Sequence, residues 1–533
     1  MTLQGTQIIA SEFKATGTDQ VRAVSPIDGE TLPTSFAQAT PDEVTAAAAA
    51  AQEAWPAFRR TDPATRAALL RRIAQEIEAL GDELIERGRL ETGLPAARLE
   101  SERGRTCGQL RMFAELIEEG SWVDARITTA MPDRTPLPRP DLRRMLVSLG
   151  PVAVFCASNF PLAFSVAGGD TASALAAGCP VVVKAHSSHP GTAELVGQAV
   201  AAAVRHEKLP GGVFSLLHGP GRSVGIDLVT NEFITAVGFT GSYSGGRALF
   251  DAAAGRPKPI PVYAEMGSIN PVFVLPGAAR ERSAQIASGL TGSVTLGVGQ
   301  FCTNPGMVVG MAGESFDTLA EATGREISGV DAGIMLNDRI QRAYVEGLRT
   351  LQSTGQVKQL AVGRESSPDA SPEAAAGQAT LLRTSAAAVL AERSLSEEVF
   401  GPATLLVAAD DREQMLEIAR TLVGHLTCTV HATEEDLREY ADLIAVLEEK
   451  AGRLICNGYP TGVEVCAAMT HGGPFPATTD PHFTSVGTAA ILRFARPVTW
   501  QSFPDTALPP ELRRANPRKI LRLVDGVYTR EAG

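Results

Sequence analysis

The residue best suited to covalent chemistry is Cys302, which lies in the run GVGQFCTNPG (297–306). Its neighbours are small, flexible or turn-forming, and they favour a thiol presented on a loop over one packed in a core. Such a thiol can attack a carbonyl carbon. Free cysteines are more often buried structural residues, so this interpretation depends on other segments.

Three further segments lie where strands are expected to end. Glu265 begins EMGSINP (265–271) after an expected strand, which places its carboxylate at the sheet edge where α/β active sites form. Asn159 in ASNFPL (157–162) follows another strand, and its amide can donate to an oxyanion. The run FTGSYSGG (239–246) is a strand-to-helix turn able to hold a pyrophosphate. Taken singly, each segment is also typical of an ordinary turn.

The elements that position these residues alternate between strand and helix. Alternation of this kind predicts a doubly wound α/β domain with a largely parallel sheet. A second α/β stretch extends from about 265 to 471 and contains one polar surface loop at 363–377. The first domain's strands are expected at 152–157, 180–184, 213–217 and 233–239, with a helix at 191–204.

Helices are expected to precede the sheet. The residues TPDE (40–43) form a capping box before an alanine-rich helix, and Asp62-Pro63 opens one long amphipathic stretch to about Gly93. The proline-rich run MPDRTPLPRP (131–140) ends this helical region. We therefore expect three parts: a dinucleotide-binding domain, a catalytic domain, and bridging or oligomerisation segments. Their boundaries are 1–126 with 150–264, 265–471, and 127–149 with 472–533.

Composition excludes several classes of protein. A chain of 533 residues predicts two or three domains. The net charge of −12, without any basic block, argues against nucleic acid as a partner. No apolar run reaches the roughly 18–20 residues of a membrane span, and the N-terminal residues lack the pattern of a secretory signal. Seven scattered cysteines without a CxxC pair disfavour disulfides and zinc, so a cytoplasmic protein is expected.

The histidines give no metal set, and no metal is expected. His186 and His189 flank the loop after the expected strand 180–184, but no other ligand is suitably spaced from them. His218 and His471 are interpreted as satisfied structural groups. No histidine is assigned to catalysis.

Together with EEVFGP (397–402), the segments described above resemble the aldehyde dehydrogenase superfamily over nearly the whole chain. The combination and order carry this resemblance. It implies an α/β fold with a Rossmann-like cofactor domain, an α/β catalytic domain and a β bridging element. The variants EMGSINP, GQFCTNPG (299–306) and PATTDP (476–481) are similar to one branch in particular. That branch contains the 2,5-dioxopentanoate (α-ketoglutarate semialdehyde) dehydrogenases and the NADP-dependent fatty aldehyde dehydrogenases.

The resemblance implies a covalent mechanism. Cys302 matches the nucleophile, which would form a thiohemiacetal and then, after hydride transfer, a thioester. Asn159 and the backbone N–H of Cys302 match the oxyanion hole, in which one donor contributes roughly 3 kcal/mol. Glu265 matches the base that activates the hydrolytic water. The run GGPFPA (472–477) departs from the pattern of many relatives and offers no second acid/base group, so Glu265 is expected to act alone.

The resemblance also implies a nicotinamide cofactor. Ser187 stands where many NAD-preferring relatives carry a glutamate, and Arg222 matches an arginine that contacts the 2′-phosphate of NADP. These two residues predict a preference for NADP, with NAD also possible. The remaining matches are the pyrophosphate-binding Gly241, Ser242 and Gly246, the adenosine-ribose lysine Lys184, and the nicotinamide-holding pair Glu398 and Phe400.

The substrate is an aldehyde whose identity the residues leave open. The branch favours 2,5-dioxopentanoate, and the alternative is a medium- or long-chain fatty aldehyde. No arginine that binds a substrate carboxylate can be placed from the sequence. In the family a hairpin pairs with a partner subunit, so a homodimer or homotetramer is expected, with 142–149 and the C-terminal tail as candidates. Residues matching the aldehyde tunnel are Phe164, Ala167, Phe301, Thr303, Pro460, Thr461 and Gly462.

Three competing interpretations stay open. The first is an enzyme that resolves the thioester with coenzyme A, and the second is one that reduces an acyl phosphate. Both leave Glu265 without a task. The third is an inactive cofactor-binding or structural protein, because a fold alone does not establish a function. Such a protein is expected to have lost at least one of the matched residues, and none is missing.

Overall fold

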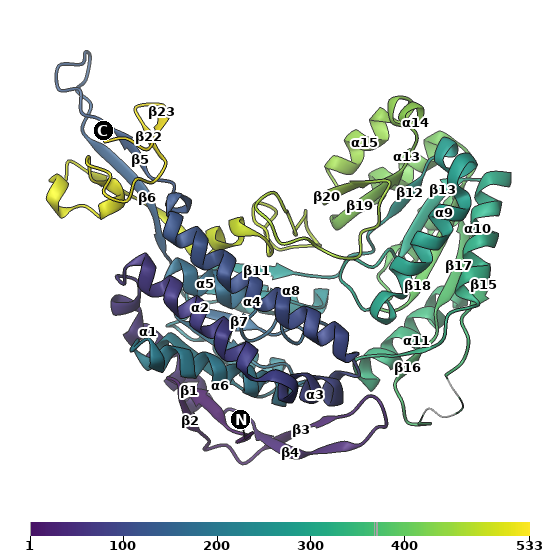
Figure 1. Cartoon of the computed structure of the whole chain (residues 1–533). Helices are drawn as coiled ribbons and strands as arrows, with labels where there is room; N and C mark the ends of the chain where they lie inside the picture. The colour runs from purple at the N-terminus through teal and green to yellow at the C-terminus, as the bar shows by residue number, and fades with distance from the viewer. Residues whose placement is uncertain (1, 367, 369–370, 533) are drawn as a thin grey trace.

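The computed structural model describes every residue except 1, 367, 369–370 and 533. Its elements form two α/β lobes and a β arm that projects from the first lobe (Figure 1). The predicted fold class is confirmed. None of the helices in the described ranges is long and apolar enough to cross a membrane.

The first lobe contains a seven-stranded sheet in the order β11-β10-β7-β8-β9-β1-β2. The strands from β11 to β9 are parallel, as the alternation predicts, whereas β1 pairs antiparallel with β9 and β2 with β1. The bounds are β1 Gln7–Ile9, β2 Glu12–Lys14, β7 Val152–Phe155, β8 Val181–Lys184, β9 Phe214–Leu217, β10 Ala236–Thr240 and β11 Val262–Glu265.

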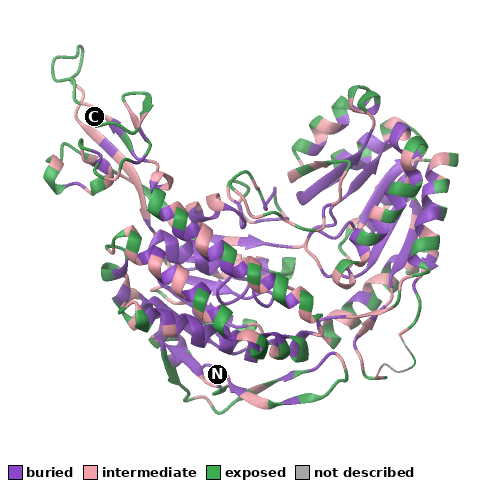
Figure 2. Cartoon of the chain, in the orientation of Figure 1, coloured by how far each residue is buried: buried purple, intermediate pink, exposed green. Residues whose placement is uncertain are grey.

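Helices cover both faces of this sheet, and the strands between them are buried (Figure 2). The capping box of Thr40 and Glu43 is confirmed at the start of α1. The stretch expected to run unbroken from 62 to 93 is in fact two helices, because Gly81 adopts a left-handed φ of 55° after α2 ends. The bounds are α1 Pro41–Phe58, α2 Pro63–Ala79, α3 Gly81–Thr92, α4 Ala96–Glu119, α5 Gly169–Ala177, α6 Pro190–His206, α7 Ile226–Thr230 and α8 Tyr243–Ala254.

The second lobe contains another seven-stranded sheet, in the order β15-β17-β18-β13-β12-β19-β20. All its strand pairs are parallel except β15 with β17. The bounds are β12 Val272–Val274, β13 Met307–Met311, β15 Lys358–Val362, β17 Thr380–Ser385, β18 Ala403–Ala409, β19 His425–His431 and β20 Ala451–Cys456.

Helices again cover both faces of this sheet. The expected surface loop at 363–377 ends in a short strand, β16 (Ala376–Gly377), which pairs with β14 (Gly333–Ile334); its residues 367 and 369–370 lie outside the described ones. The helices are α9 Pro276–Thr295, α10 Glu314–Ile327, α11 Asp338–Ser353, α12 Ala386–Ala391, α13 Arg412–Thr421, α14 Glu434–Glu439 and α15 Ala441–Glu448.

The arm is a five-stranded sheet built from both candidate segments (Figure 1). Strand β6 (Leu142–Ser148) pairs along its whole length with β21 (Ala495–Gln501). The C-terminal tail adds β22 (Arg522–Val524) and β23 (Val527–Thr529), with β22 parallel to β5 (Arg126–Thr128). A separate hairpin of β3 (Gln20–Val24) and β4 (Thr31–Ala37) lies near the N-terminus. The tail, whose role the sequence leaves open, therefore forms much of the arm.

Candidate active site

Cys302 lies on a tight loop between the 3-10 turn η4 (Leu296–Gly299) and β13. Gly299 has a φ of 65°, and a Cβ at this position would lie 2.3 Å from the carbonyl of Gly401. Only glycine therefore fits here. The Asn270 side-chain amide donates to the carbonyls of Cys302 (2.8 Å) and Asn304 (3.0 Å), which fixes the loop from the other side.

Glu265 is the last residue of β11 and is buried. Its backbone pairs with Thr478 in an isolated antiparallel bridge, and Met266 N–H donates to the Ala477 carbonyl at 2.8 Å. The Ser485 hydroxyl donates to Glu265 Oε2 at 2.5 Å. The segment that departs from the family pattern therefore packs directly against the strand end carrying Glu265.

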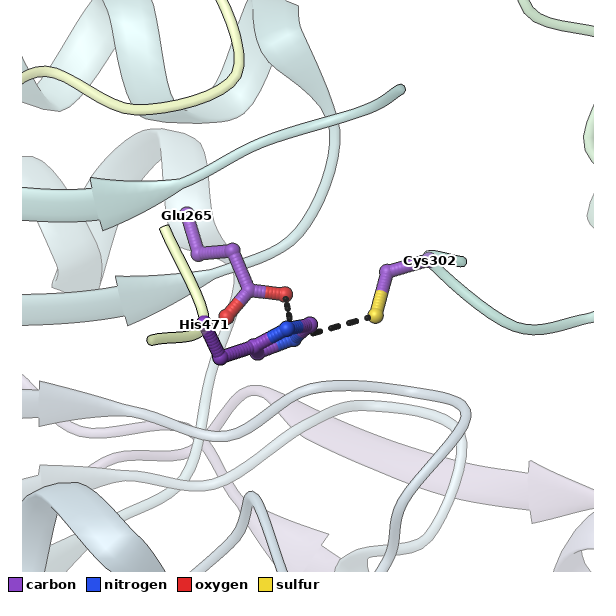
Figure 3. Close-up of side chains that lie close together, drawn as sticks. All are labelled: Glu265, Cys302 and His471. Atoms are coloured by element: carbon purple, nitrogen blue, oxygen red, sulfur yellow. Dashed lines mark hydrogen bonds and ion pairs between the residues drawn. The ribbon is translucent and has the colours of Figure 1, made fainter. Parts of the chain in front are cut away.

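His471 stands between Cys302 and Glu265 (Figure 3). Its Nε2 lies 3.5 Å from Cys302 Sγ and 2.9 Å from Glu265 Oε1. The His471 backbone N–H donates to Thr484 Oγ1 at 2.8 Å, which helps to hold the residue in place. The interpretation of His471 as a satisfied structural group stays a prediction, but the sequence does not reveal that its ring lies beside Cys302 and Glu265. His471 directly precedes the run GGPFPA (472–477), in which no second acid/base group is expected from the sequence. An imidazole therefore lies beside Glu265 after all.

The charges of this cluster are coupled. Burial and the nearby Glu265 carboxylate raise the pKa of Cys302 well above the usual thiol value. Burial raises the pKa of Glu265, but His471, Ser485 and Cys302 outweigh it and hold that pKa below its usual value. The resting pair is therefore a neutral thiol beside a carboxylate. The three groups also lie within 4.8 Å of one another, a spacing that a metal ion accepts and that the sequence does not reveal.

Asn159 follows β7 and lies at the loop of Cys302. Its Nδ2 donates to the carbonyl of Gln300 at 3.0 Å. The next turn is held by Glu102 on α4, whose Oε1 accepts from the backbone N–H groups of Leu162 (2.8 Å) and Ala163 (2.9 Å). The structure thus brings together all three residues that the sequence singles out for catalysis.

The residues expected to bind a cofactor lie at the carboxyl ends of the parallel strands. Gly241 and Ser242 form the turn from β10 to α8, where Ser242 caps the helix by accepting from Gly245 N–H at 3.3 Å. Gly246 is buried against Met266. Lys184 ends β8, and burial lowers its pKa to about 8. This arrangement provides helix N–H donors and a cation at one sheet edge, as a dinucleotide requires.

The remaining cofactor candidates lie around that edge. Ser187 is exposed in the loop after β8, and Arg222 is exposed in the helical turn Gly221–Gly225, which packs against β8. Glu398 packs against the backbone of Gly267, where an added Cβ would lie 2.1 Å from the carboxylate. Phe400 precedes Gly401, whose carbonyl accepts from the side chain of Asn304 at 3.1 Å.

Most of the expected substrate residues surround Cys302. Phe164 lies 5.1 Å from Phe160, and Phe160 lies 5.5 Å from Phe301, between ring centroids. The Phe164 ring is also 6.3 Å from that of His471. Ala167 differs, because it is fully buried in the core of the first lobe and does not belong to this aromatic cluster.

The loop containing Pro460, Thr461 and Gly462 also reaches the site. Arg453 donates to the carbonyls of Pro460 (2.6 Å) and Gly462 (3.0 Å). Thr461 Oγ1 donates to the carbonyl of Thr303 at 3.5 Å, next to Cys302.

Of the two histidines interpreted as satisfied structural groups, His218 is buried beside Phe36, but its ring nitrogens have no partner among the described residues.

Comparisons with known proteins identify the relatives of this chain. The profile of the aldehyde dehydrogenase family matches residues 13–474. α-Ketoglutaric semialdehyde dehydrogenase 2 of Azospirillum brasilense is 51% identical over 99% of both chains. α-Ketoglutaric semialdehyde dehydrogenase of Acinetobacter baylyi is 45% identical over 98% of this chain and 99% of its own. The crystal structure of PnpE in complex with nicotinamide adenine dinucleotide superimposes with a TM-score of 0.79 at 22% identity, covering 96% of this chain and all of that one.

Proposed function

The chain belongs to the aldehyde dehydrogenase family of oxidoreductases, and we propose that it oxidises 2,5-dioxopentanoate to 2-oxoglutarate with NADP+. The observation that supports this substrate is the sequence identity to two enzymes named for this semialdehyde. It is 51% for one and 45% for the other, over nearly the full length. The predicted family and reaction class are confirmed.

The first chemical step needs a thiolate at Cys302, and the neighbouring residues can remove the thiol proton when the substrate is bound. Because the pKa of Cys302 is raised, the thiol must lose its proton to a neighbouring base. His471 Nε2, 3.5 Å from the sulfur, accepts that proton while the proton it donates to Glu265 Oε1 at 2.9 Å passes to the carboxylate. Glu265 releases this proton to solvent before the second step. The thiolate then bonds to the aldehyde carbon, and the carbonyl oxygen becomes an oxyanion that Asn159 and the Cys302 N–H stabilise.

The second step hydrolyses the thioester on Cys302. Glu265 accepts a proton from water, whose oxygen bonds to the acyl carbon as the C–S bond breaks. Its net-lowered pKa keeps the carboxylate ionised for this task. The acid leaves, and the sulfur regains a proton. Coenzyme A as the acyl acceptor would leave this carboxylate without a role.

The cofactor site fits a nicotinamide dinucleotide, which would supply the hydride acceptor between these steps. Gly241 and Ser242 would hold the pyrophosphate at the N-terminus of α8, with Gly246 packed behind them, and Lys184 would donate to the adenosine ribose. Glu398 and Phe400 would hold the nicotinamide ribose and ring. The uncharged Ser187 and the exposed Arg222 support NADP over NAD, because a 2′-phosphate would meet a cation and no carboxylate there.

A fatty aldehyde is the second candidate substrate. Phe160, Phe164 and Phe301 form an apolar cluster beside the cysteine, which an aliphatic chain would also fill. We propose that Phe164, Phe301, Thr303 and the loop 460–462 contact the substrate in either case, with Ala167 behind them.

The test is the formation of NADPH at 340 nm with 2,5-dioxopentanoate, succinate semialdehyde, hexanal and decanal. Each assay is repeated with NAD+ and with added coenzyme A. We expect the highest kcat/KM for 2,5-dioxopentanoate with NADP+. A higher value for the alkanals would replace the proposed substrate, and a clear preference for NAD+ would overturn the cofactor proposal.

We also propose a homodimer or homotetramer joined through the arm, since the arm is held mainly by its own short strands and exposes apolar side chains. Seven unpaired cysteines fit a reducing compartment, and we propose the cytoplasm. The proposed domains remain 1–126 with 150–264 for the cofactor, 265–471 for catalysis, and 127–149 with 472–533 for bridging.

A further inference from the structure

One arginine next to the aromatic cluster, Arg105, has no ion-pair partner among the described residues. Arg105 on α4 places its guanidinium carbon 5.4 Å from the ring centre of Phe164 and 5.7 Å from that of Phe160. The Phe164 ring continues to His471, whose Nε2 is 3.5 Å from Cys302 Sγ. The guanidinium therefore lies against the same aromatic wall that borders the reacting sulfur.

Two other arginines near the site have partners within the protein. Arg98 pairs with the buried carboxylate of Glu102 at 2.8 Å, and Arg453 donates to the carbonyls of the 460–462 loop. By contrast, Arg105 Nε and Nη2 are buried without a hydrogen-bond acceptor, and none of the described carboxylates lies within ion-pair distance. Of these three arginines, Arg105 leaves two buried donors without an acceptor, Arg453 leaves Nε alone, and Arg98 leaves none.

An unpaired buried guanidinium is costly, because burial removes its water and the group stays charged at neutral pH. Burial lowers the pKa of Arg105, while Glu102, Cys302 and Glu265 act as the negative charges that raise it. The two carboxylates are tied elsewhere, to backbone N–H groups and to His471. No other carboxylate among the described residues pairs with Arg105, and the forked donors of arginine match the carboxylate of a ligand.

We infer that Arg105 binds the carboxylate of the substrate at the end remote from the aldehyde, so that the site selects aldehydes that carry an anionic group. This inference rests on the proposed function and supplies the carboxylate-binding residue that the sequence does not reveal. The aldehyde reaches Cys302, the methylene groups pack on Phe160 and Phe164, and the carboxylate meets the guanidinium. An alkanal would leave that charge buried and unpaired.

The rival role for Arg105 is to stabilise the Cys302 thiolate, since each group influences the pKa of the other. The two roles differ in what they predict for neutral substrates. Loss of a carboxylate-binding group penalises anionic aldehydes alone, whereas loss of a thiolate-stabilising charge penalises every aldehyde equally. Matched pairs of substrates therefore separate them.

The experiment compares the intact enzyme with Arg105→Gln, Arg105→Lys and the control Arg111→Gln. Arg111 lies on the same helix, but it is exposed and pairs with Glu78 on α2. The substrates are 2,5-dioxopentanoate and succinate semialdehyde, against pentanal and methyl 4-oxobutanoate, the neutral ester of the latter. For Arg105→Gln we expect kcat/KM with anionic aldehydes to fall about 100-fold, mainly through KM, and to stay within about threefold for neutral ones. Arg105→Lys should recover part of the loss, and Arg111→Gln should resemble the wild type.

Binding of 2-oxoglutarate, followed by calorimetry, gives a readout that does not need turnover. We expect Arg105→Gln to abolish this binding and Arg111→Gln to retain it. Equal losses for anionic and neutral substrates, or unchanged 2-oxoglutarate binding, would overturn the inference while the proposed function stands. A wild-type preference for succinate semialdehyde would overturn the proposed substrate and support the role of Arg105. A wild-type preference for pentanal would overturn both.

Discussion

At the scale of single residues, Cys302 is a neutral thiol at rest, and His471 and Glu265 lie beside it as the proposed proton acceptors. Burial and Glu265 keep the proton on the sulfur, which protects the thiol from adventitious electrophiles at rest. His471 lies where that proton can move when a substrate carbonyl is present. The same carboxylate therefore raises the pKa of the resting thiol and, in the proposed mechanism, activates the water of the second half-reaction.

Glu265→Gln should separate these two effects. The neutral amide removes a charge that raises the pKa of Cys302, so the thiolate fraction at neutral pH should grow and alkylation by iodoacetamide should accelerate. Hydrolysis should slow, so acyl-enzyme should accumulate as a burst of NADPH. Glu434→Gln, on the first turn of α14, is the control and should leave both rates unchanged. Slower alkylation in Glu265→Gln would contradict the assigned cause of the raised pKa.

His471→Gln should act in the opposite sense. Without the imidazole, the thiol of Cys302 loses the proton acceptor 3.5 Å away, and kcat/KM should fall by roughly 10²–10⁴. Because the thiol pKa is raised, part of this loss should be recovered as pH increases, when hydroxide removes the proton. The pH profile of kcat/KM measures this directly. A uniform loss at every pH would assign His471 a positioning role only.

At the scale of elements, α4 supports the site through two side chains that do not touch the reacting carbon. Glu102 and Arg105 lie three positions apart and so share one face of the helix. Glu102 fixes the turn after Asn159 by accepting from the backbone N–H groups of Leu162 and Ala163. Arg105 faces the aromatic cluster.

Glu102→Ala should therefore damage both stability and catalysis. It leaves two backbone N–H groups without an acceptor and frees Arg98 from its partner, for a cost of about 3–5 kcal/mol in the free energy of unfolding. Asn159 should lose its position, so kcat should fall more than KM changes. Urea denaturation and steady-state kinetics measure the two effects. Glu102→Gln keeps one acceptor oxygen and should be milder; equal damage from both variants would show that the charge, rather than the hydrogen bonds, matters.

The elements also show what the sequence can predict. Buried valine-rich runs such as β8 and the capping box of α1 are local signals, and both agree with the structure. The break at Gly81 is a single glycine inside a periodic pattern, which periodicity alone does not reveal. His471 lies 169 positions from Cys302, and only the packing of the 471–485 segment on β11 brings them together. Arg105 is one arginine among many on an amphipathic helix, and only its missing partner distinguishes it.

At the scale of the whole molecule, the arm presents an apolar surface that the two lobes leave uncovered. Its own small core consists of residues such as Leu508, Leu512 and Ile520. Outside that core, Val527 is 66% and Tyr528 64% exposed, and both belong to the outermost strand, β23. An exposed apolar edge strand is a surface that a partner chain would cover.

Replacing Val527 and Tyr528 together by aspartate should therefore weaken self-association. Charge on both side chains opposes the burial of β23 against a second copy. The strand contacts neither Cys302 nor the cofactor edge, so the separated subunits should still form NADPH. Light scattering coupled to size exclusion measures the mass, with Val345→Asp as the control, because Val345 is 51% exposed on α11. We expect a smaller species for the arm variant and an unchanged one for the control. If the arm variant keeps the wild-type mass, the subunit contact lies elsewhere; if it dissociates and loses activity, the arm also supports the site through the partner.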